Sequence, residues 1–254
     1  MNEPVDELRV IPLPIRGEIS VGERLDAKIL EACRQTRVSF QAGDILIVKH
    51  KVVSKAEGSI VDLGKMQPST STKAWAKQYK LDARVTQLAL REAKKVIRRK
   101  NGVLITETKH GFICANSGVD VSNVDGGRHA VLLPRDADRS ARRLHRALLK
   151  KLSFSVPVII CDSWGRAWRE GLTEAAIGIA GMKALNDYRG TRDAHGYELH
   201  ATVEAVADQL ACAAGLVCGK LSNTPACIIR GFRYQAGPGS SRDLLRPVKN
   251  DLFR

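Results

Sequence analysis

Long apolar runs are missing from this sequence, and its first residues do not have the pattern of a secretory signal. No apolar stretch approaches the length of a membrane-spanning helix. The opening residues, MNEPVDELRV, carry acidic side chains where a signal peptide has a basic segment followed by an apolar one. These absences predict a soluble cytoplasmic protein with no membrane partner.

Aromatic residues and paired cysteines are also scarce. Aromatics make up 5% of the chain and do not interleave with its basic runs, so stacking platforms for nucleic-acid bases are not evident. The six cysteines lie far apart without a C-x-x-C pair, and most sit in apolar runs. This spacing disfavours zinc and disulfides, and it predicts buried thiols in a reducing compartment.

The two commonest phosphate-binding motifs are absent. The chain contains no G-x-x-x-x-G-K-[ST], and no G-x-G-x-x-G that follows a strand and opens a helix. Any nucleotide site must therefore be built in another way.

What the chain does have is positive charge. Its 41 Lys and Arg against 27 Asp and Glu give a formal net charge of +14. Such a surface attracts polyanions, and two classes compete: nucleic acid, and a phosphate-rich small substrate used with a nucleoside triphosphate. The densest basic runs, residues 91–100 and 139–151, fall on helical patterns, where a solvated outer face is the simpler interpretation.

Hydrophobic periodicity predicts the elements. Apolar spacing of three and four residues predicts helices after Asp82 (continuing to Val96), after Asp138, and across about 202–218. The Ser/Thr/Pro-rich patch 66–79 is predicted to be a loop or short crossover. Short apolar runs bounded by turn residues predict strands at 44–53, 102–108, 111–115, 130–134, 156–161 and 225–231.

The spacing of these strands predicts the fold class. Several follow one another too closely for intervening helices, so hairpins are favoured over a purely parallel sheet. We expect an α+β fold with mixed, largely antiparallel sheets and packed helices. Residues 1–254 are expected to form one domain, with two lobes if the region around 65–110 is an inserted part.

The segment ANSGVDVSNVDGG, residues 115–127, carries the clearest chemical signal. Asp120 and Asn123 offer one charged and one neutral oxygen within a tight, glycine-flanked turn. Hard divalent cations such as Mg²⁺ and Mn²⁺ prefer such oxygen ligands, usually together with water and substrate phosphate. The alternative is an Asx-turn loop whose side chains satisfy only its own backbone.

Two further segments place polar side chains after apolar runs. In IICDSWGRAWREG, residues 159–171, Asp162 and Ser163 follow a strand and suit metal coordination, while Arg166 and Arg169 suit a phosphate or carboxylate. A polar turn with stacked Trp and Arg is the alternative. In VVSKAEGS, residues 52–59, Lys55 can reach a phosphate or can simply be an exposed loop lysine.

Taken in order, these blocks resemble the coenzyme F420-0:L-glutamate ligase family, GTP-dependent γ-glutamyl ligases of deazaflavin cofactor biosynthesis. The resemblance covers most of the chain from about residue 40. It rests on several ordered blocks, among them VVSKAEG, ETKHGFICANSGVDVSNV, DSWGRAWREG, ADQLACAAGLVCGK and RPVKNDLFR. It implies the two-lobed α+β fold of that family and an intertwined homodimer.

The resemblance also implies roles for individual residues. Asp120 would bind a divalent cation and Asn123 the guanine nucleotide. Asp162 would hold the same cation. Ser163, where the family usually has threonine, would hold a second one.

The nucleotide contacts carry over in the same way. Lys55 would touch the GTP phosphates, with His50 and Lys51 beside it. The family's nucleotide-contacting tetrapeptide falls on Arg16, Gly17, Glu18 and Ile19, although RGEI departs from its apolar pattern. After the long helix the family has glycine and then glutamine, whose amide ligates the second cation. Here Gly219 is followed by Lys220, which cannot ligate while protonated.

The implied reaction joins L-glutamate to the deazaflavin F420-0 through an acyl phosphate, with release of GDP and phosphate. Mg²⁺ or Mn²⁺ would be required, and assistance by K⁺ is left open. Candidate acceptor residues are Arg166, Arg169, Arg189 and Arg230. Lys220 and Trp164, which replaces a usual phenylalanine, keep open a ligase of this family for a folate or pterin. A nucleotide-binding relic without catalysis and a basic nucleic-acid-binding protein also stay open.

Overall fold

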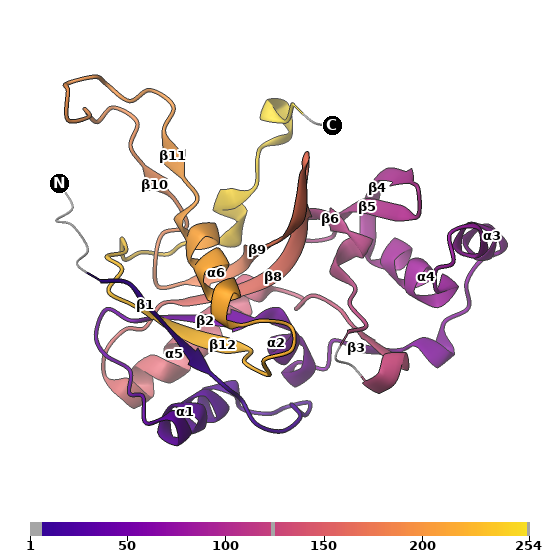
Figure 1. The fold of residues 1–254 in the computed structure, drawn as a ribbon, viewed down its shortest axis with the longest axis horizontal. Helices are drawn as coiled ribbons and strands as arrows, with labels where there is room; N and C mark the ends of the chain where they lie inside the picture. Colours follow the sequence, from indigo (N-terminus) through magenta and orange to yellow (C-terminus); the bar gives the residue numbers. More distant parts are fainter. Residues whose placement is uncertain (1–6, 123–124, 253–254) are drawn as a thin grey trace.

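A five-stranded sheet forms the centre of the larger lobe, hereafter the main lobe (Figure 1). The computed structural model describes residues 7–122 and 125–252. The strand order is β1-β12-β2-β8-β9, and only β2 and β8 pair in parallel. The strands are β1 (Arg9–Leu13), β2 (Ile45–Lys49), β8 (Val158–Arg166), β9 (Arg169–Ala180) and β12 (Ala226–Arg230).

Helices cover both faces of this sheet. Successive strand side chains point to opposite faces, so Leu46 and Val48 pack into one core with α1 (Leu25–Thr36) and α5 (Ala137–Leu152). Ile45 and Ile47 pack into a second core on the other face, under α6 (Val206–Val217). The near-continuous apolar run of β2 follows from this burial on both sides.

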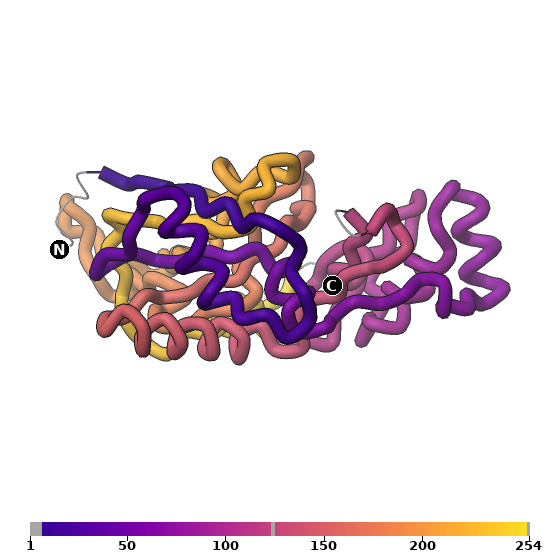
Figure 2. Tube along the Cα trace, turned by 90° about the horizontal axis from the view of Figure 1, so that it is seen from below, coloured from indigo at the N-terminus to yellow at the C-terminus, as the bar shows by residue number. Residues whose placement is uncertain are grey.

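A small lobe extends to one side of the main lobe (Figures 1 and 2). It has its own core, formed by Leu63, Leu88, Ala89, Leu104, Val119 and Ala130. Its helices are α3 (Thr70–Gln78) and α4 (Ala83–Glu92). Its strands are β3 (Ile60–Asp62), β4 (Ala93–Lys100), β5 (Val103–Thr108), β6 (Ile113–Ala115) and β7 (His129–Val131).

The remaining elements are short. Helix α2 (His50–Ala56) follows β2 directly, and β10 (Asn186–Asp187) pairs with β11 (Val203–Glu204) in a ribbon that projects from the main lobe (Figure 1). Single 3-10 turns lie at Leu63–Lys65, Asn116–Gly118, Asp125–Gly127, Ser241–Leu244 and Val248–Asn250. These elements confirm the predicted α+β class with mixed, mostly antiparallel sheets.

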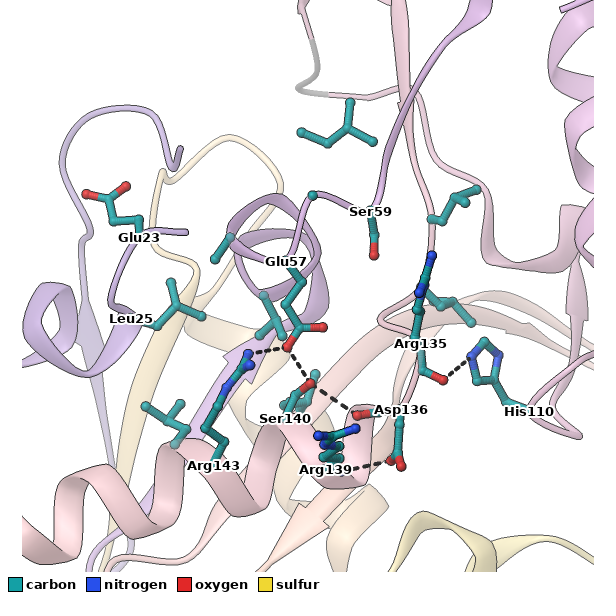
Figure 3. A pocket seen from close by; sticks show the side chains of 18 of the residues that line it. Glu23, Leu25, Glu57, Ser59, His110, Arg135, Asp136, Arg139, Ser140 and Arg143 are labelled. Atoms are coloured by element: carbon teal, nitrogen blue, oxygen red, sulfur yellow. Dashed lines mark hydrogen bonds and ion pairs between the residues drawn. The ribbon is translucent and has the colours of Figure 1, made fainter. Parts of the chain in front are cut away.

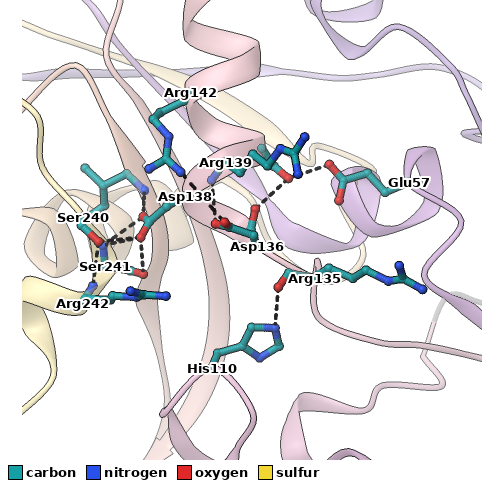
Figure 4. A network of polar contacts seen from close by, with 12 residues as sticks. Glu57, His110, Arg135, Asp136, Asp138, Arg139, Arg142, Ser240, Ser241 and Arg242 are labelled. Atoms are coloured by element: carbon teal, nitrogen blue, oxygen red, sulfur yellow. Dashed lines mark hydrogen bonds and ion pairs between the residues drawn. The ribbon is translucent and has the colours of Figure 1, made fainter.

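A buried carboxylate fixes β9 and the C-terminal segment to α5. Asp138, in the first turn of α5, accepts hydrogen bonds from the backbone N–H of Ile179 (2.8 Å), Ser240 Oγ (2.6 Å) and the backbone N–H of Ser241 (3.0 Å). Figure 4 shows this network. Because strand β9 is held in this way, the hairpin that it forms with β8 has a fixed position at the edge of the sheet.

The sequence prediction was wrong for residues 91–100. The helix that begins after the Asp82 cap ends at Glu92, and the basic run that follows forms strand β4. Strand β4 pairs with β5 with register shifts after Ala93 and Val96. These irregularities remove the strict alternation of a strand, so the pattern resembled a helical one.

Three other boundaries also differ. The predicted strand 44–53 ends at Lys49, where α2 begins, and the patch 66–79 contains α3, whose N-cap Ser69 accepts from the Thr72 N–H. The predicted strand 156–161 is β8, which continues to Arg166, so Asp162 and Ser163 lie within the β8–β9 hairpin and not after the strand. Tertiary burial of Val52 and Val53, together with capping by Ser69, overrode the local patterns.

The predicted starts of the two other helices differ less from the structure. The N-cap of α5 is Asp136 and not the predicted Asp138, and α6 begins at Val206 and not near 202.

The cysteines are mostly buried. Five of the six lie in the interior, which fits their prediction as small apolar residues. Within residues 7–122 and 125–252 no helix is long and apolar enough to cross a membrane.

Candidate functional site

A cavity of about 950 Å³ opens at the carboxyl end of β2. The β8–β9 hairpin continues beyond the last residue of β2, and loops before β12 and after β1 complete the walls. All the described residues that were predicted to bind a cation or the nucleotide line this cavity. They are Arg16, Gly17, Glu18, Ile19, His50, Lys51, Lys55, Asp120, Asp162, Ser163, Gly219 and Lys220. Asn123 lies outside the described residues.

Helix α2 presents one face to the cavity and the other to the core. His50, Lys51 and Lys55 line the cavity, whereas Val53 and Ala56 belong to the apolar core. This division follows from helical periodicity, since positions 51 and 55 share a face. Lys55, predicted at the end of a strand, is therefore held on a helix, where its Nζ pairs with Glu18 Oε2 at 2.8 Å.

Asp162 is held by two donors and lies beside a buried histidine. Its Oδ1 accepts the backbone N–H of Ser163 at 2.8 Å and lies 3.2 Å from His50 Nε2, which makes no hydrogen bond with the described residues. Its Oδ2 accepts Trp164 Nε1 at 2.8 Å. Burial opposes ionisation, but His50 and these donors hold the pKa of Asp162 below its ordinary value. The site therefore contains a carboxylate that is ionised at neutral pH.

Asp120 approaches the same cavity from the small lobe. Its Oδ2 lies 2.8 Å from Lys51 Nζ, and its Oδ1 accepts the backbone N–H of Ser122 at 2.6 Å. Burial raises the pKa of Asp120, but the hydrogen bonds from Lys51 and Ser122 outweigh it, so the pKa is lowered. The Asx-turn alternative is thus correct in part, because Asp120 satisfies its own loop while also facing the cavity.

Asp162 and Ser163 point to opposite faces of strand β8. Asp162 contacts His50 and Trp164 on the face of α2, whereas Ser163 Oγ donates to Glu174 Oε1 (2.8 Å) on β9. The alternation of a strand requires this division. Both residues line the cavity, but on different walls.

Sequence reasoning missed Lys49 and Glu174. Glu174 lies opposite Ser163 in the β8–β9 register, and its Oε1 pairs with Lys49 Nζ. The hairpin was the available signal, but it was insufficient. Pairing Arg166 with Arg169 and counting back places Leu172 opposite Ser163, and only the register shift between Gly165 and Arg166 brings Glu174 there. Further residues missed on the walls are Leu172, Gly215, Cys218, Asn223 and Thr224.

The candidate acceptor arginines lie elsewhere. None of the four is among the described residues that line the cavity. Arg166 and Arg169 flank the hairpin turn, and Arg189 pairs with the neighbouring Asp187. Arg230, at the far end of β12, makes a pair with the buried Asp44 at 2.8 Å. Trp164, expected near the acceptor, packs against Phe112 at 5.3 Å between ring centroids.

A second and larger cavity, of about 1410 Å³, lies between α2, α5 and the small lobe (Figure 3). Its central carboxylate, Glu57, accepts Ser140 Oγ at 2.6 Å and Arg143 at 2.5 Å. His110 contacts the backbone oxygen of Arg135 at 3.2 Å. This cavity contains no predicted site residue, and the contacts of Glu57 with Ser140 and Arg143 join α2 to α5 within the main lobe.

The cavity at β2 offers carboxylates for a cation but no complete metal cage. Within the part of the chain that the structure describes, no group of three or more His, Cys, Asp and Glu has the arrangement of a metal site. Mg²⁺ is commonly held by one or two carboxylates together with water and substrate phosphates. Asp120 and Asp162, both ionised and on one cavity, fit that mode of binding.

Comparisons with known proteins identify the family of this chain. The sequence profile of the F420-0:Gamma-glutamyl ligase family matches residues 15–231. The coenzyme F420:L-glutamate ligase of Methanopyrus kandleri is 40% identical over 252 residues, which cover 97% of this chain and 98% of that protein. The enzyme of the same name from Methanocaldococcus jannaschii is 42% identical over 216 residues, covering 85% and 86%. A third, from Archaeoglobus fulgidus, is 38% identical over 248 residues and 97% of each chain. The chain therefore belongs to the F420-0:gamma-glutamyl ligase family.

Proposed function

We propose that this protein is a GTP-dependent ligase that joins L-glutamate to coenzyme F420-0 and releases GDP and phosphate. One observation carries the proposal: Asp120 from the small lobe and Asp162 from the main lobe line a single cavity together with Lys51, Lys55 and Lys220. Paired carboxylates among lysines suit a triphosphate bound with a divalent cation. Family membership supports the same reaction class.

The chemistry needs little from the protein beyond placement and charge. A carboxylate is a poor electrophile, so the γ-phosphoryl group of GTP is first transferred to a carboxylate of the acceptor, giving an acyl phosphate and GDP. The amine of glutamate then attacks the acyl carbon, and the C–O bond to phosphate breaks as the amide forms. No side-chain nucleophile takes part, which fits a cavity lined by carboxylates, lysines and backbone.

Asp120 and Asp162 would hold Mg²⁺ or Mn²⁺. When bound, that cation offsets the negative charge of the phosphate oxygens. The lowered pKa values of both aspartates keep the two ligands ionised near neutral pH. The Ser163 backbone N–H and Trp164 Nε1 orient Asp162, and Lys51 orients Asp120, so the two lobes present their carboxylates before substrate arrives.

The rest of the cavity would hold the nucleotide. The loop 16–19 and the turn at Gly219 and Lys220 line the same cavity as α2. Glycines at positions 17 and 219 have no neighbouring heavy atom closer than 4.0 Å to an added Cβ, so these turns leave open space. Lys55 and Lys220 would offset charge on the phosphates.

The test is GDP release from GTP in the presence of Mg²⁺ and L-glutamate, with coenzyme F420-0 as acceptor. Turnover with F420-0 is expected, together with a product heavier by one glutamyl residue in mass spectrometry. Turnover with folate alone would show that the enzyme belongs to the same reaction class with another acceptor. Salt-sensitive RNA binding without GDP release with either acceptor would refute the ligase proposal.

The oligomeric state and the need for a monovalent cation can be tested beside this proposal. A homodimer is expected by family resemblance, and light scattering of the purified protein measures it. Replacing K⁺ by Na⁺ in the assay determines whether a monovalent cation assists.

A further inference from the structure

Glu174 has a buried oxygen that the described part of the chain does not use. Its side chain is 10% exposed and lines the candidate cavity. Oε1 accepts Ser163 Oγ at 2.8 Å and pairs with Lys49 Nζ, whereas Oε2 is buried with no hydrogen-bond partner among the described residues. A buried carboxylate oxygen without a donor is costly, so its retention calls for an explanation.

The surrounding structure keeps this oxygen in place. Glu174 lies opposite Ser163 in the β8–β9 register, and its backbone oxygen accepts Cys212 Sγ at 3.2 Å from α6. Gly215 of α6 leaves room for the side chain, because an added Cβ would come within 2.8 Å of Glu174 Cγ. The carboxylate is thus fixed from a strand on one side and a helix on the other.

Lys49 gives this wall both signs of charge. Its side chain is 18% exposed, lines the cavity, and is paired with Glu174 Oε1. An ammonium group carries three N–H donors, so one pairing leaves donors for a ligand. The wall therefore presents Glu174 Oε2, an acceptor without a donor among the described residues, beside an ammonium group that keeps N–H donors for a ligand. The α-amino acid head group has the complementary arrangement, with an ammonium next to a carboxylate.

We propose that Glu174 and Lys49 form the subsite for the incoming α-amino acid, with Glu174 Oε2 accepting from its amine and Lys49 Nζ donating to its α-carboxylate. This inference rests on the proposed ligase function and specifies where its nucleophile binds. The proposal assigns different ligands to two walls of the cavity. Asp162 lies on the wall that faces α2, and Ser163 and Glu174 lie on the wall that faces α6. The amine is held on the second wall, apart from the carboxylates assigned to the cation.

A divalent cation at Glu174 fits the same observations less well. Lys49 already places a positive charge on Oε1, and a second cation at Oε2 would be repelled at short range. The described residues also supply no third His, Cys, Asp or Glu to form a metal group there. We therefore treat metal binding at this wall as an outcome that contradicts the proposal.

The experiment compares two nucleophiles. Glu174→Gln keeps the size of the side chain and removes its charge, and Glu170→Gln on the exposed part of β9 is the matched control. In Glu174→Gln the KM for L-glutamate should rise about 10- to 100-fold, as expected for loss of a hydrogen bond to a charged group. The KM for GTP and the Mn²⁺ concentration for half-maximal rate should not change.

Hydroxylamine then separates binding of the amino acid from activation of the acceptor. It traps an acyl phosphate as a hydroxamate with release of phosphate, and it needs no amino-acid subsite. Glu174→Gln should form hydroxamate from F420-0 and GTP at the rate of the unmodified enzyme. Gly215→Ala, which displaces Glu174 without removing it, should also raise the KM for L-glutamate alone.

The outcomes are distinct. An unchanged KM for L-glutamate in Glu174→Gln overturns the proposal, and so does a rise in the KM for GTP or in the Mn²⁺ requirement. Loss of hydroxamate formation in the variant also overturns it. Absence of both hydroxamate and glutamylated product with the unmodified enzyme would instead refute the ligase function itself.

Discussion

Lys51 Nζ lies 2.8 Å from Asp120 Oδ2, and this ion pair joins the two lobes at the candidate site. Lys51 belongs to α2 of the main lobe, and Asp120 pairs with Val131 at the edge of the small lobe. Lys51 also donates to Ser122 Oγ at 2.7 Å. The position of the small-lobe carboxylate therefore depends on a helix that immediately follows β2.

Asp120→Asn tests this relationship. The amide keeps the turn contact to Ser122 but removes the negative charge, so turnover should fall roughly 100-fold or more, as for loss of an electrostatic stabiliser. Thermal unfolding should change little. Asp125→Asn, in the same loop but exposed, is the control for a general effect on the loop. An Asp120→Asn enzyme as active as this control would remove Asp120 from the site.

Asp162→Ala should reduce both activity and stability. The change leaves the Trp164 indole N–H without its acceptor and removes the carboxylate beside the buried His50, so the free energy of unfolding should fall by about 1–3 kcal/mol. Asp162→Asn keeps an acceptor and should lose turnover with a smaller loss of stability. Urea unfolding measured beside GDP release checks both values, and equal stability of the two variants would contradict the assigned contacts.

The pH dependence of stability gives a second test of Asp162. Its folded pKa lies below that of an unfolded aspartate, about 3.9. The ionised carboxylate therefore contributes its full stabilisation above that pH, and the contribution is lost as pH falls through the folded pKa. In Asp162→Asn this part of the acid slope should disappear. Urea midpoints between neutral pH and pH 3 measure it, and an unaltered slope would contradict the assignment.

Lys220→Gln should change the cation dependence of the reaction. Lys220 lines the cavity where the family resemblance implies a ligating glutamine, and an ammonium cannot coordinate a metal. The amide should introduce a second Mn²⁺ requirement, seen as a sigmoidal instead of hyperbolic dependence of rate on Mn²⁺. Lys249→Gln, remote from the cavity, is the control. Identical Mn²⁺ curves for the two variants would show that position 220 does not contact a cation.

Arg230→Met should affect stability and leave substrate binding unchanged. Removing Arg230 leaves the buried carboxylate of Asp44 without its ion-pair partner, a change that costs about 3–5 kcal/mol. The KM for F420-0 should stay the same, because Arg230 lies at the end of β12 away from the cavity. Arg189→Met, which breaks an exposed pair, is the control and should unfold at nearly the original temperature. A large rise in the KM for F420-0 would restore Arg230 as an acceptor residue.

The local signals of the sequence were reliable where a single segment decides the outcome. Asp82 and its apolar periodicity predicted the start of α4, because a cap and its helix are neighbours in the chain. The same helix was extended too far, since the strand β4 depends on pairing with β5 and on bulges that no local pattern shows. The beginning of α2 was also missed, because the apolar run continues across it.

The sequence by itself determined the inventory of the site: carboxylates at 120 and 162, lysines at 51, 55 and 220, and the family to which their order points. Only the tertiary structure decided that Asp162 and Ser163 face different walls, that Glu174 meets Lys49, and that the candidate arginines lie elsewhere. The physical reason is distance along the chain. Residue types are local properties, whereas hairpin register, sheet order and the meeting of two lobes arise from contacts between remote segments.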